Sequence, residues 1–120
     1  MPPKILMVED DSETQQSMQL LLTTSGYEVT TARNGAEALE SARTSTPDLL
    51  LTDLNMPEMD GVELCRSFKA QRRLRLVPII VASALPGLPA PLHGMVQAFF
   101  RKPLDLARLL SALAFYVPDK

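Results

Sequence analysis

Short apolar runs that alternate with helical patterns constrain the fold of this chain more than any other feature. The runs are mostly continuous, which is typical of parallel strands covered on both faces. Between successive runs lie segments long enough for one crossover helix. The runs occupy residues 4–8, 27–32, 47–54, 77–84 and 98–103. We therefore expect an α/β fold, a doubly wound sheet of five parallel strands.

The segments between the runs carry helix signals at their ends. Ser12 and Gln15 have the spacing of a capping box, and the segment that they open stops at Gly26. Asn34 is the expected cap of the next helix. The predicted helices cover residues 12–26, 34–43, 60–74 and 104–116.

The connection between the fourth and fifth runs departs from this pattern. It reads LPGLPAPLHGMVQ over residues 85–97, with three prolines and two glycines. Proline inside a helix removes a hydrogen bond and clashes with the preceding turn, and glycine lowers helix propensity. We predict that the fourth crossover helix is missing or cut to about one turn.

Length and composition indicate one globular domain over residues 1–120. The net charge of −2 gives no argument for nucleic acid or an anionic membrane as the main partner. No apolar run approaches the ~20 residues of a membrane span, and the N-terminus lacks the layout of a signal peptide. The single cysteine, Cys65, lies on an apolar helical stripe and excludes an intramolecular disulfide. We expect a cytoplasmic, reducing compartment.

Polar side chains lie at or near the carboxyl ends of four of the apolar runs. Glu9 and Asp10 follow the first run, and Asp53, Ser83 and Lys102 are each the last residue but one of the third, fourth and fifth runs. In an open α/β sheet, ligands bind outside the carboxyl ends of the strands. We therefore expect three carboxylates, one hydroxyl and one ammonium to meet at one edge of the sheet.

This set of groups suits phosphoryl transfer. Clustered carboxylates are hard oxygen ligands of the kind that Mg²⁺ takes, and an ammonium can hold a phosphoryl oxygen. A carboxylate beside a metal can itself act as the nucleophile and form an acyl phosphate. The residues alone therefore predict metal-assisted phosphoryl transfer to an aspartate.

Four motifs carry a resemblance to a known family. In chain order they are VEDDS, TDLNMPEMDG, VPIIVASA and FFRKP. Together they resemble the receiver domain of two-component response regulators, over essentially the whole chain. The resemblance implies a flavodoxin-like sheet with the strand order 2-1-3-4-5.

The resemblance also implies a role for each acidic residue. Asp53 is the expected phosphoacceptor. Asp10 would bind Mg²⁺ directly, Glu9 would act mostly through a water on the metal, and Asn55 would offer its backbone carbonyl. Mn²⁺ is expected to substitute for Mg²⁺, and no other cofactor is implied. Asp11 lies outside this set and is expected to help begin the following helix.

The remaining site residues come from the last two motifs. Ser83 matches the hydroxyl that turns toward a new phosphoryl group. Lys102 matches the lysine that bonds a phosphoryl oxygen, and its bond to Pro103 would be cis. Phe99 stands where the family has a switch aromatic, often a tyrosine.

Two further positions concern the loops around the site. Gly61 is expected to adopt a conformation that other residues resist. Leu85 stands where the family tunes hydrolysis of the phosphoryl group, and because an apolar side chain does not position water, we expect slow self-dephosphorylation.

The function that follows from the resemblance is signal transduction. A histidine kinase or histidine phosphotransfer protein would supply the phosphoryl group to Asp53, and the surface would switch for a downstream partner of unknown identity. The domain would catalyse only its own phosphorylation and slow dephosphorylation, and is not expected to be an enzyme with turnover. We expect a monomer or weak dimer, since the altered 85–97 segment belongs to the family's usual dimer face. We expect the domain to bind neither nucleic acid nor membrane.

Other readings stay open at this stage. A receiver that no longer takes phosphate would serve as a phosphorylation-independent interaction module. A metal-dependent phosphatase with an aspartyl nucleophile is a second alternative, but it requires an acid at the position of Asn55. A flavin-binding module is a third, but Glu9 and Asp10 would repel the flavin phosphate. We interpret the basic run over residues 66–75 as a solvated helix face. The alternative is that it contacts nucleic acid or an acidic partner.

Overall fold

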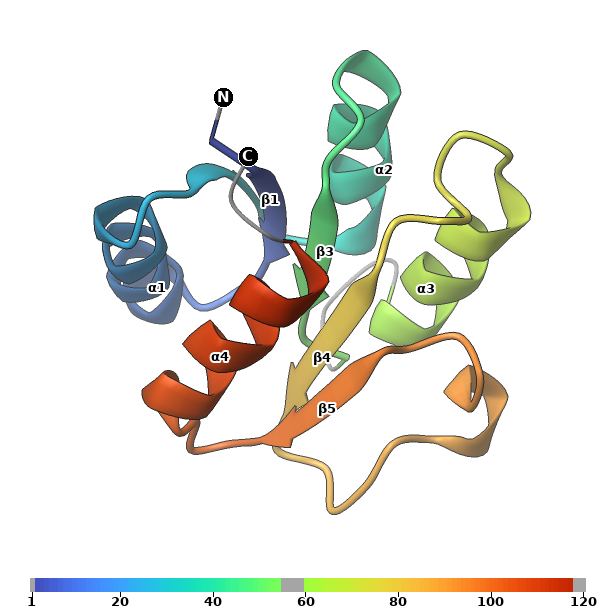
Figure 1. Ribbon diagram of the computed structural model, residues 1–120. Coiled ribbons are helices and arrows are strands. Elements are labelled where there is room, and N and C mark those ends of the chain that lie inside the picture. Colours follow the sequence, from blue (N-terminus) through green and yellow to red (C-terminus); the bar gives the residue numbers. More distant parts are fainter. Residues whose placement is uncertain (1, 55–59, 118–120) are drawn as a thin grey trace.

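A single five-stranded parallel sheet forms the centre of the molecule (Figure 1). The computed structural model describes residues 2–54 and 60–117. The strand order is β2-β1-β3-β4-β5, which confirms the expected topology. The strands are β1 (Lys4–Val8), β2 (Glu28–Ala32), β3 (Leu49–Thr52), β4 (Ile79–Ser83) and β5 (Ala98–Arg101).

Four helices cover the two faces of the sheet. They are α1 (Ser12–Thr24), α2 (Gly35–Thr44), α3 (Gly61–Ala70) and α4 (Leu106–Tyr116). Leu6 and Val8 of β1 belong to a core with buried side chains of α2 and α3. Ile5 and Met7 belong to a second core with side chains of α1 and α4. Because successive strand residues point to opposite faces, the continuous apolar run of β1 serves both cores.

Short polar side chains begin the helices. The N-cap side chains of Asn34 and Asp60 accept hydrogen bonds from the backbone N–H three residues on. The capping-box prediction for the first helix is wrong at the cap residue, which is Asp11 rather than Ser12. Gln15 does not reach back to the cap, because its side-chain amide donates to the carbonyls of Glu9 and Ala32 instead.

The connection between β4 and β5 lacks an α-helix. One 3₁₀ turn, η1 (Ala90–Leu92), is its regular element, and it confirms the prediction drawn from the prolines and glycines. Leu92 is fully buried and anchors the segment to the core that it shares with α3. The side of the sheet beyond α3 is therefore covered by a thin loop rather than by a helix (Figure 1).

The described helices include none that is both long and apolar enough to cross a membrane.

Candidate functional site

Three carboxylates meet at the carboxyl edge of the sheet. Glu9 follows β1 and Asp53 follows β3, and these two strands are hydrogen-bonded neighbours. One oxygen from each of Glu9, Asp10 and Asp53 can be chosen so that all three lie within 4.8 Å of one another. Glu9 and Asp53 are buried, at 7% and 9% exposure, whereas Asp10 is exposed. Like charges this close repel unless a cation lies among them.

Lys102 supplies a cation to this cluster. Its Nζ donates to Glu9 Oε1 at 3.0 Å and to Asp53 Oδ2 at 2.9 Å. Its backbone N–H donates to the carbonyl of Ser83 at 2.8 Å, which fixes the end of β5 against β4. Burial would lower the pKa of Lys102, but the hydrogen bonds that its Nζ donates to Asp53 and Glu9 outweigh burial and raise that pKa. The side chain is therefore a charged ammonium.

Backbone amides orient two of the carboxylates. The N–H of Leu54 donates to Asp53 Oδ1 at 2.6 Å, and the N–H of Asp11 donates to Glu9 Oε2 at 3.1 Å. No donor among the described residues reaches the carboxylate of Asp10. Asp10 therefore points an exposed carboxylate, with both oxygens open to a ligand, at the mouth of the cluster.

Ser83 lies in the same cleft, together with Glu9, Asp10, Asp53 and Lys102. It is 1% exposed, and its Oγ accepts a hydrogen bond from the backbone N–H of Leu85 at 3.2 Å. Leu85 itself is 40% exposed and lines the cleft. The hydroxyl is thus close to the cluster but engaged with its own loop.

Asp11 is separated from the cluster by its role as a helix cap. Its Oδ2 accepts from the backbone N–H of Thr14 at 2.9 Å and from the Thr14 hydroxyl. These two hydrogen bonds, the hydroxyl first, lower the pKa of Asp11. The expectation that Asp11 helps begin the helix is confirmed.

Gly61 is needed for a different reason from the one predicted. Its φ is not in the left-handed region, which glycine occupies here at Gly26 and Gly94. A Cβ at position 61 would instead overlap the carbonyl oxygen of Asp53 and the Cα of Leu54. The N-terminus of α3 therefore packs directly on the backbone that carries Asp53, and only glycine allows that approach.

The other singled-out residues have clear places. The Lys102–Pro103 bond is cis, as expected. Phe99 is half-buried in β5 and packs against the core beside α3. Cys65 is buried, and burial raises the pKa of its thiol to about 12, which agrees with a structural role. Asn55 lies outside the described residues.

This donor set fits a divalent metal and a phosphoryl group. Carboxylate oxygens are hard ligands suited to Mg²⁺, and one ammonium can hold a phosphoryl oxygen as a point charge. Glu9 Oε1 and Asp53 Oδ2 are occupied by Lys102, so the open oxygens of Asp10 are the first that a metal would meet.

Sequence comparison decides the family. The model of the family described as "Response regulator receiver domain" matches residues 5–114. The chain belongs to the response regulator receiver family. As a receiver it is a domain of two-component signalling and not a conventional enzyme.

Curated relatives and solved structures agree with this assignment. The polar-differentiation response regulator DivK of Brucella anthropi is 34% identical to the receiver over 122 residues, covering 99% of both chains. The chemotaxis response regulator CheY4 of Vibrio cholerae has a TM-score of 0.90 at 28% identity, covering 98% of this chain and 100% of that one.

A third relative bears on the metal. The receiver domain of a sensor histidine kinase from Pseudomonas aeruginosa PAO1 has a TM-score of 0.87 at 32% identity, covering 97% of this chain and 98% of that one. Its structure holds a magnesium ion coordinated in the active-site cleft. In this receiver, Glu9, Asp10 and Asp53 lie together in a cleft and could hold a metal ion.

Sequence reasoning missed two features of the site. It did not foresee that Lys102 bridges Glu9 and Asp53, because a side chain's partner cannot be read from its position alone. It also missed Leu54, whose backbone N–H holds Asp53. A backbone N–H that donates a hydrogen bond cannot be recognised from the type of residue that carries it.

Proposed function

We propose that this receiver accepts a phosphoryl group on Asp53 from phosphohistidine of a histidine kinase or phosphotransfer protein. The observation that carries the proposal is the bridge from Lys102 Nζ to Asp53 Oδ2, at 2.9 Å, and to Glu9 Oε1, at 3.0 Å. It brings a cation from one end of the chain to an aspartate in the middle, at the rim where ligands of such sheets bind.

Mg²⁺ would be held directly by Asp10 and Asp53, and Glu9 would act mostly through a water on the metal. Mn²⁺ would be able to substitute for Mg²⁺. The backbone carbonyl of Asn55 is a further proposed ligand, at a position outside the described residues. When bound, the metal supplies positive charge opposite the oxygens of the transferring phosphoryl group.

The chain's own residues would perform the transfer. A carboxylate oxygen of Asp53 attacks the phosphorus, the bond from phosphorus to the donor's imidazole nitrogen breaks, and that nitrogen leaves with its electron pair. The product is an acyl phosphate on Asp53. The ammonium of Lys102 would leave the carboxylate and hold a phosphoryl oxygen, which stabilises the charge that develops in the transition state.

The signal would be a shift in the population of two surface arrangements. Ser83 Oγ would exchange its hydrogen bond from the Leu85 N–H for one to a phosphoryl oxygen, and half-buried Phe99 would move inward behind it. The changed surface would bind an output partner. The cytoplasm, where kinases of this kind act, is the proposed location.

A second candidate function is phosphorylation-independent binding. The observation in its favour is the connection between β4 and β5, which lacks the helix that its neighbouring crossovers have. In this case the residues 1–120 would form a receiver-like interaction module that needs no phosphoryl group.

Incubation with a small phosphodonor distinguishes a phosphoacceptor from a phosphorylation-independent interaction module. The purified chain is treated with acetyl phosphate, with and without Mg²⁺, and its intact mass is measured. We expect the mass increase of one phosphoryl group with Mg²⁺ and none with EDTA. Asp53→Asn should not be labelled, whereas Asp48→Asn, a conservative change remote from the cluster, should be labelled normally. No labelling of the wild type would favour the second candidate.

A further inference from the structure

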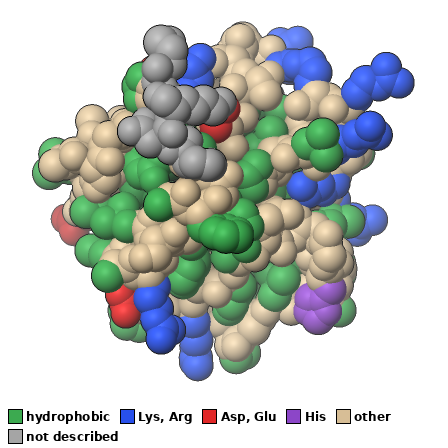
Figure 2. Space-filling view, in the orientation of Figure 1, with side chains coloured by type: hydrophobic (Ala, Val, Ile, Leu, Met, Phe, Trp, Pro, Cys, Tyr) green, Lys and Arg blue, Asp and Glu red, His purple; other side chains and the backbone are tan. Residues whose placement is uncertain are grey.

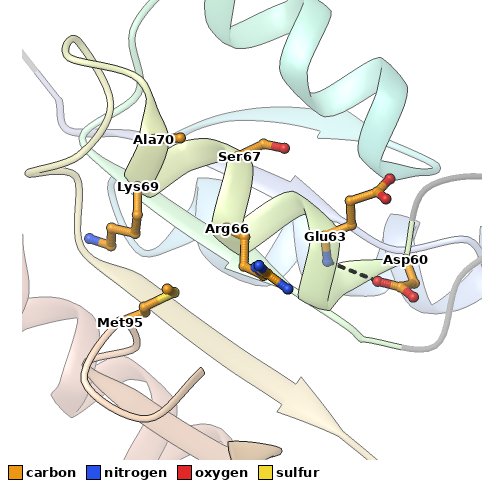
Figure 3. Close-up of a pocket in the computed structure, with 7 residues that line it drawn as sticks. All are labelled: Asp60, Glu63, Arg66, Ser67, Lys69, Ala70 and Met95. Atoms are coloured by element: carbon orange, nitrogen blue, oxygen red, sulfur yellow. Dashed lines mark hydrogen bonds between the residues drawn. The ribbon is translucent and has the colours of Figure 1, made fainter. Parts of the chain in front are cut away.

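The direction of the Asp10 carboxylate is not set by an ion pair. Asp10 is in no ion pair with a cation of the described residues. Figure 2 shows Lys and Arg side chains gathered on the α3 side of the molecule. Figure 3 shows two of them, Arg66 and Lys69, projecting from α3 on the side where Met95 lies. The groove beside α3 that they line shares no lining residue with the cleft of the acidic cluster. The backbone around Asp10 must therefore aim its carboxylate.

The side chain of Gln15 holds the backbone that precedes Asp10. Its Nε2 donates to the carbonyl of Glu9 at 3.1 Å and to the carbonyl of Ala32 at 3.3 Å. The N–H of Glu9 donates to the same Ala32 carbonyl at 3.0 Å. A glutamine amide has two N–H donors, and these two contacts use both. A side chain of α1 therefore ties the ends of β1 and β2 together.

The backbone of Gln15 holds the residue that follows Asp10. Its N–H donates to the carbonyl of Asp11 at 2.9 Å, in the first turn of α1. The N–H of Asp11 in turn donates to Glu9 Oε2 at 3.1 Å. Gln15 thus binds the carbonyl on each side of Asp10, one through its side chain and the other through its backbone.

The place of Gln15 in the helix indicates that its amide has a specific role. Gln15 is half-buried, three residues before Met18 and seven before Leu22, which are the buried residues of α1. This spacing puts all three on the inward face of the helix. A polar group on such a face costs free energy unless it is hydrogen-bonded. An apolar side chain would suit the packing, so the contribution specific to the amide is its pair of bonds to the strand ends.

We propose that Gln15 is a positioning residue of the metal site, which fixes the direction of the Asp10 carboxylate by holding the carbonyls of Glu9 and Asp11. The inference rests on the metal site of the proposed function, but it does not require transfer of a phosphoryl group. Mg²⁺ demands nearly octahedral geometry, so a ligand that is free to turn binds it more weakly. Groups that orient metal ligands typically change metal affinity by about 10- to 100-fold.

Metal binding without a phosphodonor tests the proposal. Free Mn²⁺ is measured by electron paramagnetic resonance in titrations of the purified chain, and Mg²⁺ is then added as a competitor. Gln15→Met keeps the length of the side chain and removes both donors. We expect it to raise the dissociation constant of each metal at least about 10-fold.

Gln97→Met is the matched control. The side-chain carbonyl of Gln97 accepts the N–H of Ile79 at 2.7 Å, at the opposite end of β4 from Ser83. This variant also loses a hydrogen bond between a glutamine and the backbone, but far from the acidic cluster. It should change the two dissociation constants less than about 2-fold.

Two further measurements separate positioning from stability. In labelling with acetyl phosphate, Gln15→Met should raise the Mg²⁺ concentration that gives half of the maximal rate by a larger factor than it lowers that rate. NMR of the wild type needs no variant. The side-chain amide protons of Gln15 should exchange with solvent at least about 10-fold more slowly than those of exposed Gln16.

Four results would each overturn the proposal: no binding of Mn²⁺ by the wild type, equal metal affinities of the wild type and Gln15→Met, an equal loss of affinity in Gln97→Met, or equally fast exchange of the Gln15 and Gln16 amides. A different result would refute the proposed function alone. If the wild type binds Mn²⁺ more tightly than Gln15→Met but is not labelled by acetyl phosphate, phosphoryl transfer to Asp53 is refuted and the role of Gln15 is supported.

Discussion

Three carboxylates and one ammonium leave an excess of negative charge at the acidic cluster. Lys102 holds Glu9 and Asp53, while Asp10 has no cationic partner within the described ranges. The adjacent Asp11 points away and caps α1. The two neighbouring aspartates thus have different roles. Asp10 carries a negative charge that a metal ion could balance, and Asp11 stabilises a helix.

This difference predicts that Asp10→Asn and Asp11→Asn differ in how their melting temperatures respond to Mg²⁺. Ligands that bind the folded state raise the melting temperature. We expect Mg²⁺ to raise the melting temperature of the wild type and of Asp11→Asn, because asparagine caps a helix as well as aspartate does. Asp10→Asn should melt higher than the wild type in EDTA, because repulsion is relieved, and should lose its response to Mg²⁺.

Differential scanning fluorimetry over a Mg²⁺ titration measures this directly. A Mg²⁺ response that survives in Asp10→Asn but disappears in Asp11→Asn would reverse the assignment of the two aspartates.

Leu85 bears on the lifetime of the phosphorylated form. Its apolar side chain lines the cleft and offers no hydrogen bond to an attacking water. We expect Leu85→Asn to shorten the half-life of the acyl phosphate several-fold, because an amide can position that water. Leu76→Asn, on a leucine that is 87% exposed and does not line the cleft, is the control. Equal half-lives of the wild type and Leu85→Asn, followed by intact mass after removal of the phosphodonor, would contradict this role.

Four strands and one helix position the site. β1, β3 and β5 end one residue before Glu9, Asp53 and Lys102, and β4 ends at Ser83. Helix α3 contributes by position rather than by a side chain. Its first residue, Gly61, donates its N–H to the carbonyl of Leu54 at 2.9 Å and packs on the backbone of Asp53.

A methyl group at this contact should disturb both stability and function. Gly61→Ala is expected to lower the free energy of unfolding by about 1–3 kcal/mol, because the added carbon must displace backbone. Gly87→Ala is the matched control, since nothing lies within 4 Å of a Cβ there and its φ is not positive, and its effect should stay within about 0.5 kcal/mol.

Urea unfolding gives both values, and phosphodonor labelling of Gly61→Ala under native conditions should be slower than that of Gly87→Ala. Equal unfolding free energies would show that the chain relaxes around position 61 without cost.

The elements differ in how well the sequence predicts them. The strands were predictable from the continuous apolar runs between helical segments, and their order was predicted from the resemblance to receiver domains. The loss of the fourth helix was also predictable, from prolines whose geometry excludes one. The cap at Asp11 and the reason for Gly61 were not, because both depend on which backbone groups meet in three dimensions.

In the whole molecule, parallel topology gathers residues from four distant parts of the sequence at one edge. That is why residues 9, 10, 53, 83 and 102 could be predicted as one site from strand ends alone. Their pairing could not be predicted, and neither could the groove beside α3, since a groove reflects the absence of packing between elements rather than a motif. At that edge, Lys102 and a backbone amide hold both Glu9 and Asp53, whereas neither kind of donor among the described residues reaches the carboxylate of Asp10.

The most direct test of the central claim is to locate the phosphoryl group. Borohydride reduces an aspartyl phosphate to homoserine, so the labelled protein can be reduced, digested and sequenced by mass spectrometry. We predict homoserine at position 53 and at no other aspartate, and none when Mg²⁺ is withheld. Homoserine at Asp10 or Asp11, or labelling without conversion at Asp53, would contradict the account.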